Sequence, residues 1–158
     1  MERKLKIAII TNAYPTKELP SGAFLEYILM EIAHLGHEIR IVVHANSKKS
    51  KEYLNNGVKI TEYPISLGWT PRLYQGTEIL ASLKKNGLAW VELGLSFLSA
   101  PATLKRIAQD CDLIHAIWYL PSGFAGSLAS RLLRLPLVVS AFGAEFHLPL
   151  KWPVIKAL

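Results

Sequence analysis

The stretch that most constrains the fold runs from residue 6 to residue 43, where two short apolar runs flank an amphipathic segment. The first run, residues 6–10, is apolar apart from its lysine, which is typical of a strand covered on both faces. Apolar side chains then recur at helical spacing, namely Phe24, Leu25, Ile28, Leu29, Ile32 and Leu35. Gly36 stands where helices commonly end, and residues 39–43 form the second run. This pattern predicts a βαβ unit with parallel strands.

A polar segment follows this unit. Residues 44–56 carry several lysines and predict a solvated loop, with one helical turn near residues 51–54. Asn56-Gly57 is a turn signal, and apolar and polar residues alternate over 58–63. The alternation predicts a third strand, nearer the edge of the sheet.

Glycine and proline divide residues 65–109 into short pieces. Apolar spacing predicts three helices there, over residues 79–83, 88–98 and 102–109. The second of these is apolar nearly all round, which indicates either full burial or contact with a non-aqueous surface. A glutamate and a proline interrupt this region, so we expect it to fall short of the roughly 20 clean apolar residues of a membrane span.

The last part of the chain returns to the opening pattern. Residues 112–116 and 137–140 predict two further strands, and residues 123–134 predict a helix with small residues that allow close approach to a sheet. The whole order predicts an α/β fold, an open, doubly wound and mainly parallel sheet of the Rossmann-like type. With no repeat or linker in sight, we treat residues 1–158 as one domain.

Composition limits the kinds of binding partner and the cellular compartment that suit this protein. Lys and Arg outnumber Asp and Glu by 18 to 12, and the net charge of +6 implies an anionic partner: phosphate, acidic lipid headgroups or nucleic acid. Nucleic acid is the least favoured, because the basic residues lack aromatic interleaving. The single cysteine, Cys111, excludes an intrachain disulfide, fits a reducing, cytoplasmic setting, and is interpreted as a small residue at a helix–strand junction. We see no secretory signal before the first strand.

Two common nucleotide-binding motifs are absent. Neither G-x-G-x-x-G nor the P-loop pattern follows the first strand, which argues against an NAD enzyme and an NTPase. Ligands of doubly wound sheets bind outside the carboxyl ends of the strands. Here those ends lead into residues 11–22, 44–47, 115–122 and 141–147, and we look for the site in these four loops.

Two glycine-bearing turns in these loops could receive a ligand. Ser21-Gly22 opens the predicted helix, where free backbone N–H groups favour an anion and glycine permits close approach of a phosphate or sugar. An ordinary capped helix explains the same residues equally well. Gly143-Ala144-Glu145 follows the last strand and can place a carboxylate where it accepts hydrogen bonds from hydroxyl groups.

His115 and two aromatic residues form the third candidate. His115 ends a predicted strand, so it is either a hydrogen-bonded structural histidine or a catalytic one. Trp118 and Tyr119 follow, and they can stack on a sugar ring or cover the core. The order of the histidines gives no zinc site and no Ser-His-Asp arrangement.

Taken together, five segments resemble the N-terminal domain of GT-B fold glycosyltransferases of the family 4, retaining type. They are K-I-A-I-I-T-N-A-Y-P (6–15), Pro-Ser-Gly-Ala-Phe (20–24), Leu-Gly-His-Glu-Ile (35–39), Asp-Leu-Ile-His-Ala-Ile-Trp (112–118) and the Gly-x-acid at 143–145. The resemblance covers nearly the whole chain in the right order. It implies a two-domain enzyme whose N-terminal half holds mostly the acceptor and whose C-terminal half holds most of the nucleotide-sugar donor.

The resemblance also implies roles for single residues. Ser21, Gly22 and Gly143 would approach the donor phosphates and the transferred sugar, and His115 and Glu145 would be the catalytic side chains. Glu145 stands where the family usually has aspartate, while Phe142 and Ile117 stand where many members carry histidines. We expect aromatic side chains in these loops to contact the substrate, namely Tyr14, Trp118, Tyr119 and Phe142. The donor would be a UDP- or GDP-sugar, with no metal and no permanently bound cofactor.

The partners follow from the same resemblance. We expect a lipid-linked or saccharide acceptor, a C-terminal donor domain on the same or a separate chain, and no activity from this half alone. The apolar segment 88–98 lies between basic residues, which predicts peripheral association with an anionic membrane through residues 84–106, at the inner face. Two other interpretations stay open at this point: a non-catalytic sugar- or nucleotide-binding module, and a membrane-docking subunit of a two-chain enzyme.

Overall fold

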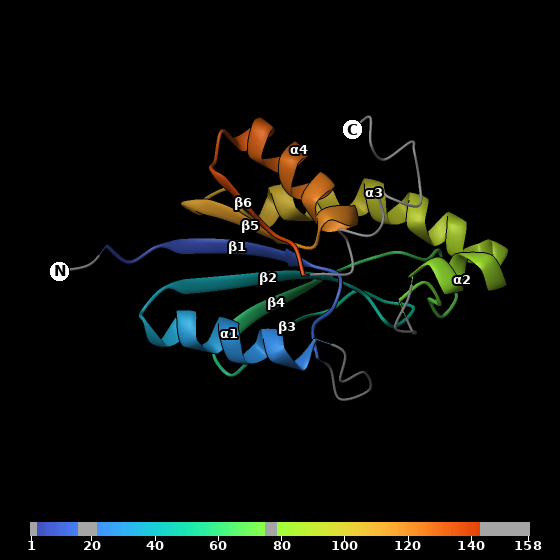
Figure 1. Cartoon of the computed structure of the whole chain (residues 1–158), viewed down its shortest axis with the longest axis horizontal. Helices are drawn as coiled ribbons and strands as arrows, with labels where there is room; N and C mark the ends of the chain where they lie inside the picture. The colour runs from blue at the N-terminus through green and yellow to red at the C-terminus, as the bar shows by residue number, and fades with distance from the viewer. Residues whose placement is uncertain (1–2, 16–21, 75–78, 143–158) are drawn as a thin grey trace.

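A computed structural model describes residues 3–15, 22–74 and 79–142, and these form one mixed α/β layer structure (Figure 1). Six strands make a single sheet in the order β3-β4-β2-β1-β5-β6. The strands are β1 (Lys6–Thr11), β2 (Glu38–His44), β3 (Glu52–Asn55), β4 (Val58–Tyr63), β5 (Leu113–Ile117) and β6 (Leu137–Ser140). All neighbours run parallel except β3 and β4, which are antiparallel. The predicted fold class is confirmed.

Helices cover both faces of the sheet. They are α1 (Ala23–His34), α2 (Ile79–Lys85), α3 (Gly87–Ile107) and α4 (Phe124–Leu133), with a short irregular turn, η1 (Tyr119–Gly123), before α4. In Figure 1, α1 lies below the sheet while α3 and α4 lie above it. The reason is chirality: β1 connects to β2 on one side and β5 connects to β6 on the other, so right-handed crossovers place α1 and α4 on opposite faces.

The predicted βαβ unit is present as β1, α1 and β2. The register pairs Ile9 with Ile41 and Ile10 with Val42. Because successive residues of a strand point to opposite faces, each face of the sheet receives apolar side chains from both strands. The helix begins after Gly22 (φ 85°) and is followed by Gly36 (φ 89°), two backbone conformations that glycine adopts without strain.

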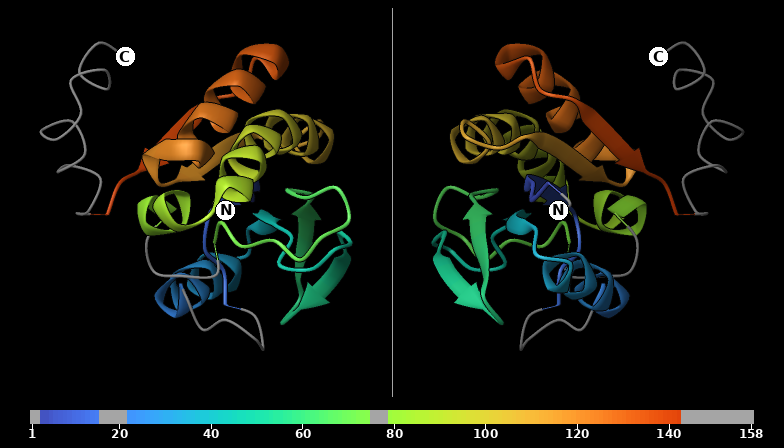
Figure 2. Two further views of the ribbon diagram at one scale, coloured as in Figure 1. Left: turned by 90° about the vertical axis from the view of Figure 1, so that its right-hand side faces the viewer. Right: turned by 90° about the vertical axis from the view of Figure 1, so that its left-hand side faces the viewer.

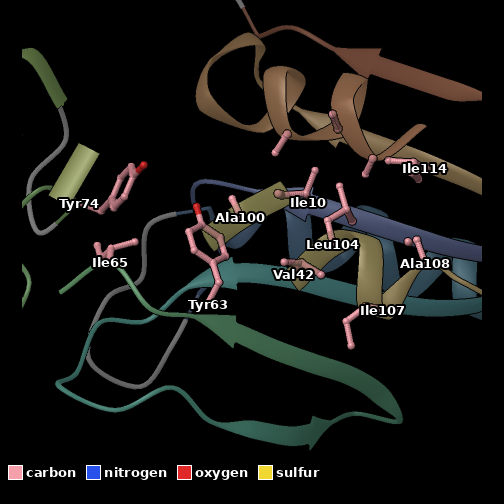
Figure 3. Close-up of a cluster of buried hydrophobic side chains, with 14 of the residues drawn as sticks. Ile10, Val42, Tyr63, Ile65, Tyr74, Ala100, Leu104, Ile107, Ala108 and Ile114 are labelled. Carbon is pink, nitrogen blue, oxygen red and sulfur yellow. The ribbon is translucent and has the colours of Figure 1, made fainter. Parts of the chain in front are cut away.

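Two apolar cores flank the sheet because successive strand residues point to opposite faces. The core under α1 joins Ile9, Ile41 and Ile60 to Leu25 and Leu29 of the helix. The larger core lies between the sheet and α3 and α4, and Figure 3 shows its central side chains. They include Ile10, Val42, Tyr63, Leu104, Ile107 and Ile114.

Helix α4 lies close to the sheet through its small residues, as expected. A Cβ on Gly126 would stand 3.0 Å from both the Ala116 Cβ and the Leu137 Cδ1. Ala125 and Ala129 are buried beside it. Cys111 is also as predicted, a buried residue between α3 and β5.

Three expectations about the secondary structure are wrong. Residues 51–54 do not form a helical turn; β3 pairs with β4 as a hairpin, because Asn56 (φ 48°) and Gly57 (φ 79°) supply the two left-handed residues of a tight turn. The two helices expected over 88–98 and 102–109 are one helix, α3, which continues through Pro101. Pro101 is buried, so its packing offsets the lost backbone hydrogen bond, a cost of about 3 kcal/mol.

The third correction concerns β5, which ends at Ile117 and not at residue 116. His115 is therefore in the middle of the strand. The apolar stripe of α1 is also only partly buried: Leu25 and Leu29 face the core, while Phe24 and Ile28 are 45% and 43% exposed.

Candidate active site at the carboxyl edge of the sheet

The loops after β1 and β5 lie next to each other at the point where the strand order reverses. Two hydrogen bonds between them, made by the side chains of Asn12 and Ser122, form what we call the Asn12–Ser122 latch. Asn12 Nδ2 donates a hydrogen bond to the Leu120 carbonyl at 2.8 Å. Ser122 Oγ donates to Asn12 Oδ1 at 2.7 Å. The latch fixes two loops at the position where open α/β sheets bind ligands. Sequence reasoning missed both Asn12 and Ser122, although Asn12 stands directly after a buried strand.

The backbone at Trp118 is strained. Its φ of 71° and ψ of 152° lie in a region that is essentially restricted to glycine, at a cost of roughly 1–3 kcal/mol. Two backbone hydrogen bonds hold it there, from Trp118 N to the Ser140 carbonyl at 2.9 Å and from Gly123 N to the Trp118 carbonyl at 3.1 Å. Such strain persists only where the surrounding structure enforces it, and it concentrates at ligand sites.

Trp118 belongs to an aromatic cluster that draws on three elements. Its ring centroid lies 6.4 Å from that of Phe24, at the start of α1, and 6.0 Å from that of Phe142, just after β6. Phe24 and Phe142 are themselves 5.3 Å apart. Both phenylalanine side chains are exposed, and Trp118 is half-buried. The structure therefore brings together two of the predicted substrate contacts, and it adds Phe24, whose exposure the helical spacing did not reveal.

His115 lies on the same face of the sheet as α1, since it pairs with Ile9 in the register. Its Nε2 is 2.8 Å from the Ser140 hydroxyl. Partial burial lowers the pKa of the imidazole, so the ring is neutral at pH 7. A neutral imidazole that is hydrogen-bonded to the Ser140 hydroxyl can relay a proton or hold a ligand hydroxyl in place. The same hydrogen bond is also what a purely structural histidine would make.

The remaining predicted residues fall into different places. Gly22 starts α1 without a side-chain cap, and a Cβ there would stand 2.9 Å from the Ala13 carbonyl oxygen. Tyr14 is only 5% exposed and packs in the core beneath α1, which leaves little of its ring for a substrate. Tyr119 is exposed in η1. Ser21, Gly143 and Glu145 lie outside the described residues.

A second polar cluster lies where β2 and β4 end. His44 is buried, and its ring stacks on that of Tyr74 with centroids 4.0 Å apart. The Ser96 hydroxyl of α3 lies 3.3 Å from the Tyr63 hydroxyl and 3.2 Å from the Tyr74 hydroxyl. Burial lowers the pKa of His44 to about 4 and raises that of Tyr63 to about 12, so both are neutral at pH 7. Figure 3 shows the two tyrosines side by side at this end of the core.

The loop after β4 is held by one buried carboxylate. Glu92 of α3 accepts hydrogen bonds from Trp69 Nε1 at 2.7 Å, from Arg72 N at 2.9 Å and from Leu73 N at 2.7 Å. Its side chain is fully buried. Sequence reasoning treated this glutamate only as an interruption of an apolar segment; in the structure it positions a loop at the carboxyl edge.

Within residues 3–15, 22–74 and 79–142, no group of three or more His, Cys, Asp or Glu side chains is placed to hold a metal ion. The start of α1, where the helix dipole favours an anion, and the aromatic cluster are the features at this edge that could receive an anion or a sugar ring.

Comparison with known proteins agrees on one family. Residues 21–157 match the glycosyl transferase 4-like domain. Over 151 residues the chain is also 28% identical to a protein of Bacillus subtilis (strain 168) named as a teichuronic acid biosynthesis glycosyltransferase, TuaC. This alignment covers 90% of the chain and 37% of the Bacillus protein, so the chain spans little more than a third of that relative's length.

Proposed function

The chain belongs to the glycosyl transferase 4-like domain family, and on this premise we propose that it forms the acceptor-side domain of a retaining glycosyltransferase. The enzyme would move a sugar from a UDP- or GDP-sugar to a lipid-linked or saccharide acceptor. A C-terminal donor domain, on the same or a separate chain, would complete the site. The acceptor-side domain would therefore be inactive alone and would work in the cytoplasm, at the inner face of the membrane.

The aromatic cluster of Phe24, Trp118 and Phe142 is the observation that carries this proposal. It lies beside the point where the strand order reverses, and two of its three rings are exposed. Flat apolar rings that combine with a few fixed polar groups are typical of small-molecule sites. A sugar offers an apolar ring face to such aromatics and hydroxyl groups to nearby polar side chains.

The polar groups beside the cluster suit the hydroxyls of a sugar. His115 and Ser140 are already hydrogen-bonded to each other, and the Asn12–Ser122 latch fixes the loop that carries Trp118. We propose that His115 contacts hydroxyl groups of the transferred sugar and orients them. We also propose that Glu145, which comes after β6 in the sequence, is the second catalytic side chain.

The start of α1 would receive the negative charge of the donor. Among the described residues no side chain caps the first N–H groups of α1, and the positive end of the helix dipole favours a phosphate oxygen there. We propose that helix dipoles and basic residues stabilise the leaving phosphate in place of a metal ion.

The acceptor would lie over the loop that Glu92 holds. Residues 69–73 stand between the end of β4 and α2, next to the buried His44–Tyr74 pair. Because one carboxylate fixes three N–H groups of this loop, its conformation is set before any ligand arrives. A preformed loop lowers the entropy cost of binding the acceptor.

A transfer assay on the protein together with its C-terminal donor domain, whether on the same or a separate chain, tests the proposal. The two domains are incubated with labelled UDP- and GDP-sugars and with either a soluble saccharide or a polyprenyl-phosphate-linked saccharide, and the anomeric configuration of the product is read by NMR. We expect transfer from one donor with the configuration retained. An inverted product contradicts the retaining mechanism, and the absence of transfer and of donor hydrolysis with every donor contradicts the enzyme.

A further inference from the structure

A polar stripe along α3 holds the loop that follows β4. Glu92, Ser96 and Ser99 recur at the spacing of one helix face. The Ser99 hydroxyl lies 2.6 Å from the Pro64 carbonyl oxygen, in a hydrogen bond that it shares with a carbonyl group of α3 itself. Ser96 contacts two tyrosine hydroxyls, and Glu92 accepts three N–H groups, as described above. Successive turns of one helix therefore fix residues 64–74 along their whole length.

This stripe also accounts for the inner side of α3. By length and composition, α3 could cross a bilayer, in contrast to the expectation from the sequence. Core helices of soluble proteins pass the same test, and a third of the apolar window of α3 is buried inside the protein. A buried carboxylate is costly unless its hydrogen bonds are satisfied, and the three N–H donors satisfy those of Glu92. One side of α3 is thus committed to positioning a loop.

The loop after β2, residues 45–51, lies next to the loop that α3 holds. Ala45 N donates a hydrogen bond to the Tyr63 carbonyl at 2.8 Å, and the last residue of β2 stacks on the ring of Tyr74. The left view of Figure 2 looks onto this edge of the sheet and shows the two loops beside each other. We call residues 45–51 and 64–74 together the β2–β4 loop pair.

The charge of the β2–β4 loop pair has a single sign. It has four charged side chains, all basic and all exposed: Lys48, Lys49, Lys51 and Arg72. Within the described part of the chain, no carboxylate forms an ion pair with any of them. At the opposite edge of the sheet, by contrast, Arg40 is paired with Asp110. Cations without a partner on fixed loops raise the local potential and attract an anion.

Arg72 is the most firmly placed of these cations. Its backbone N donates to Glu92 Oε2 at 2.9 Å, and its neighbours Pro71 and Leu73 are buried while its own side chain is exposed. The start of the side chain is therefore fixed before a ligand arrives. A guanidinium group matches a carboxylate or a phosphate with two parallel hydrogen bonds, whereas a lysine acts as a point charge.

We propose that Arg72 binds an anionic group of the acceptor, a carboxylate or a phosphate, and that the lysines of the β2–β4 loop pair add to the attraction. This inference rests on the proposed function, because it names the class of acceptor that the domain selects. The donor phosphates are assigned to the start of α1, which follows β1. Since β4 lies two strands from β1, about 10 Å across the sheet, Arg72 meets a different anionic group.

Acceptor competition tests the proposal on the protein together with its C-terminal donor domain. The acceptors are a disaccharide that ends in a uronic acid, its neutral methyl ester, and the same ester with an alkyl pyrophosphate at the reducing end. Selectivity is the ratio of kcat/KM for each anionic acceptor to that for the neutral ester. We expect a ratio of about ten or more for at least one anionic acceptor, and a smaller ratio at about 0.5 M salt. The acceptor that shows the preference identifies the source of the anionic group.

Substitutions assign the preference to the loop. Arg72→Gln should remove about tenfold of it and leave kcat/KM for the neutral ester unchanged, while Arg72→Lys should keep part of it. Glu92→Gln should raise KM for the anionic acceptor more than for the ester, whereas a purely structural role would change both alike. Arg131→Gln is the matched control, because it removes an equally accessible cation from α4 and should retain the parental preference.

Three results would overturn the proposal: equal kcat/KM for all three acceptors, an equal loss in Arg131→Gln, or a rise in the KM of the donor in Arg72→Gln as large as that of the acceptor. Absence of transfer from every donor would instead refute the proposed function. Calorimetric titration with the same three saccharides then tests Arg72 without turnover. Tighter binding of an anionic saccharide that Arg72→Gln abolishes supports the inference, and equal binding of all three contradicts it.

Discussion

Replacement of His44 by phenylalanine should make the stability of the protein less sensitive to acid. His44 is buried at the end of β2, and its ring stacks on that of Tyr74, away from water. Burial lowers the pKa of its imidazole from 6.5 to about 4, and the Asn46 side chain opposes this shift only in part. Phenylalanine preserves the flat ring and removes the titrating group.

The sign and the size of the change in the free energy of unfolding follow from the linkage between protonation and folding. Between pH 6.5 and pH 4 the unfolded chain takes up a proton at His44 that the folded chain excludes, so the free energy of unfolding falls as the pH is lowered. Each pKa unit is worth about 1.4 kcal/mol, which gives a loss of about 3 kcal/mol across this range. That is a large share of the roughly 5–15 kcal/mol that stabilises a typical domain.

The assay is urea unfolding followed by circular dichroism at several pH values between 7 and 4.5. Most carboxylates remain ionised through this window, so His44 dominates, with a smaller contribution of the same sign from His115, whose pKa is also lowered. The parent should lose stability steadily, and His44→Phe should lose much less. Equal losses in both proteins would show that the His44 ring is not excluded from protonation in the folded state.

Four further substitutions test three single features. Gly22→Ala should destabilise the protein by roughly 1–3 kcal/mol in urea unfolding, because its φ of 85° strains any other residue and the new Cβ would meet the Ala13 carbonyl; a neutral effect would contradict this backbone conformation at the start of α1. Asn12→Ala removes both bonds of the latch and should cost about 1–2 kcal/mol, with Ser122→Ala costing less; an equal cost would mean that the bond to Leu120 contributes nothing. Glu92→Gln should cost about 1–3 kcal/mol and speed amide hydrogen exchange in residues 69–73, whereas unchanged exchange would show that the loop is held otherwise.

The sequence was most informative where local chemistry and burial agree. The βαβ unit, the small residues of α4 and Gly36 at the end of the first helix follow from apolar spacing and backbone sterics, and all are present. Residues 51–54 were misread because their polar side chains suit a solvated loop as well as an edge strand. Only pairing with β4, which the Asn56-Gly57 turn makes possible, decides between the two.

Tertiary packing decided the other differences. Pro101 is a helix breaker by itself, yet burial in the core allows α3 to continue. The exposure of Phe24 could not be read from the stripe of α1, because it depends on which strands the helix covers. Glu92 looked out of place in an apolar segment; its three N–H partners come from residues about 20 positions away and leave no signal in the sequence around it.

The central claim is that substrates contact the carboxyl edge of the sheet through the aromatic cluster. The most direct measurement compares sugar transfer by the full-length protein with that of Trp118→Ala and of Tyr27→Ala, whose side chain is 74% exposed on α1. Thermal unfolding first establishes that each variant is folded. We predict that Trp118→Ala lowers kcat/KM at least tenfold while Tyr27→Ala matches the parent. A folded Trp118→Ala variant with parental kcat/KM would contradict the claim.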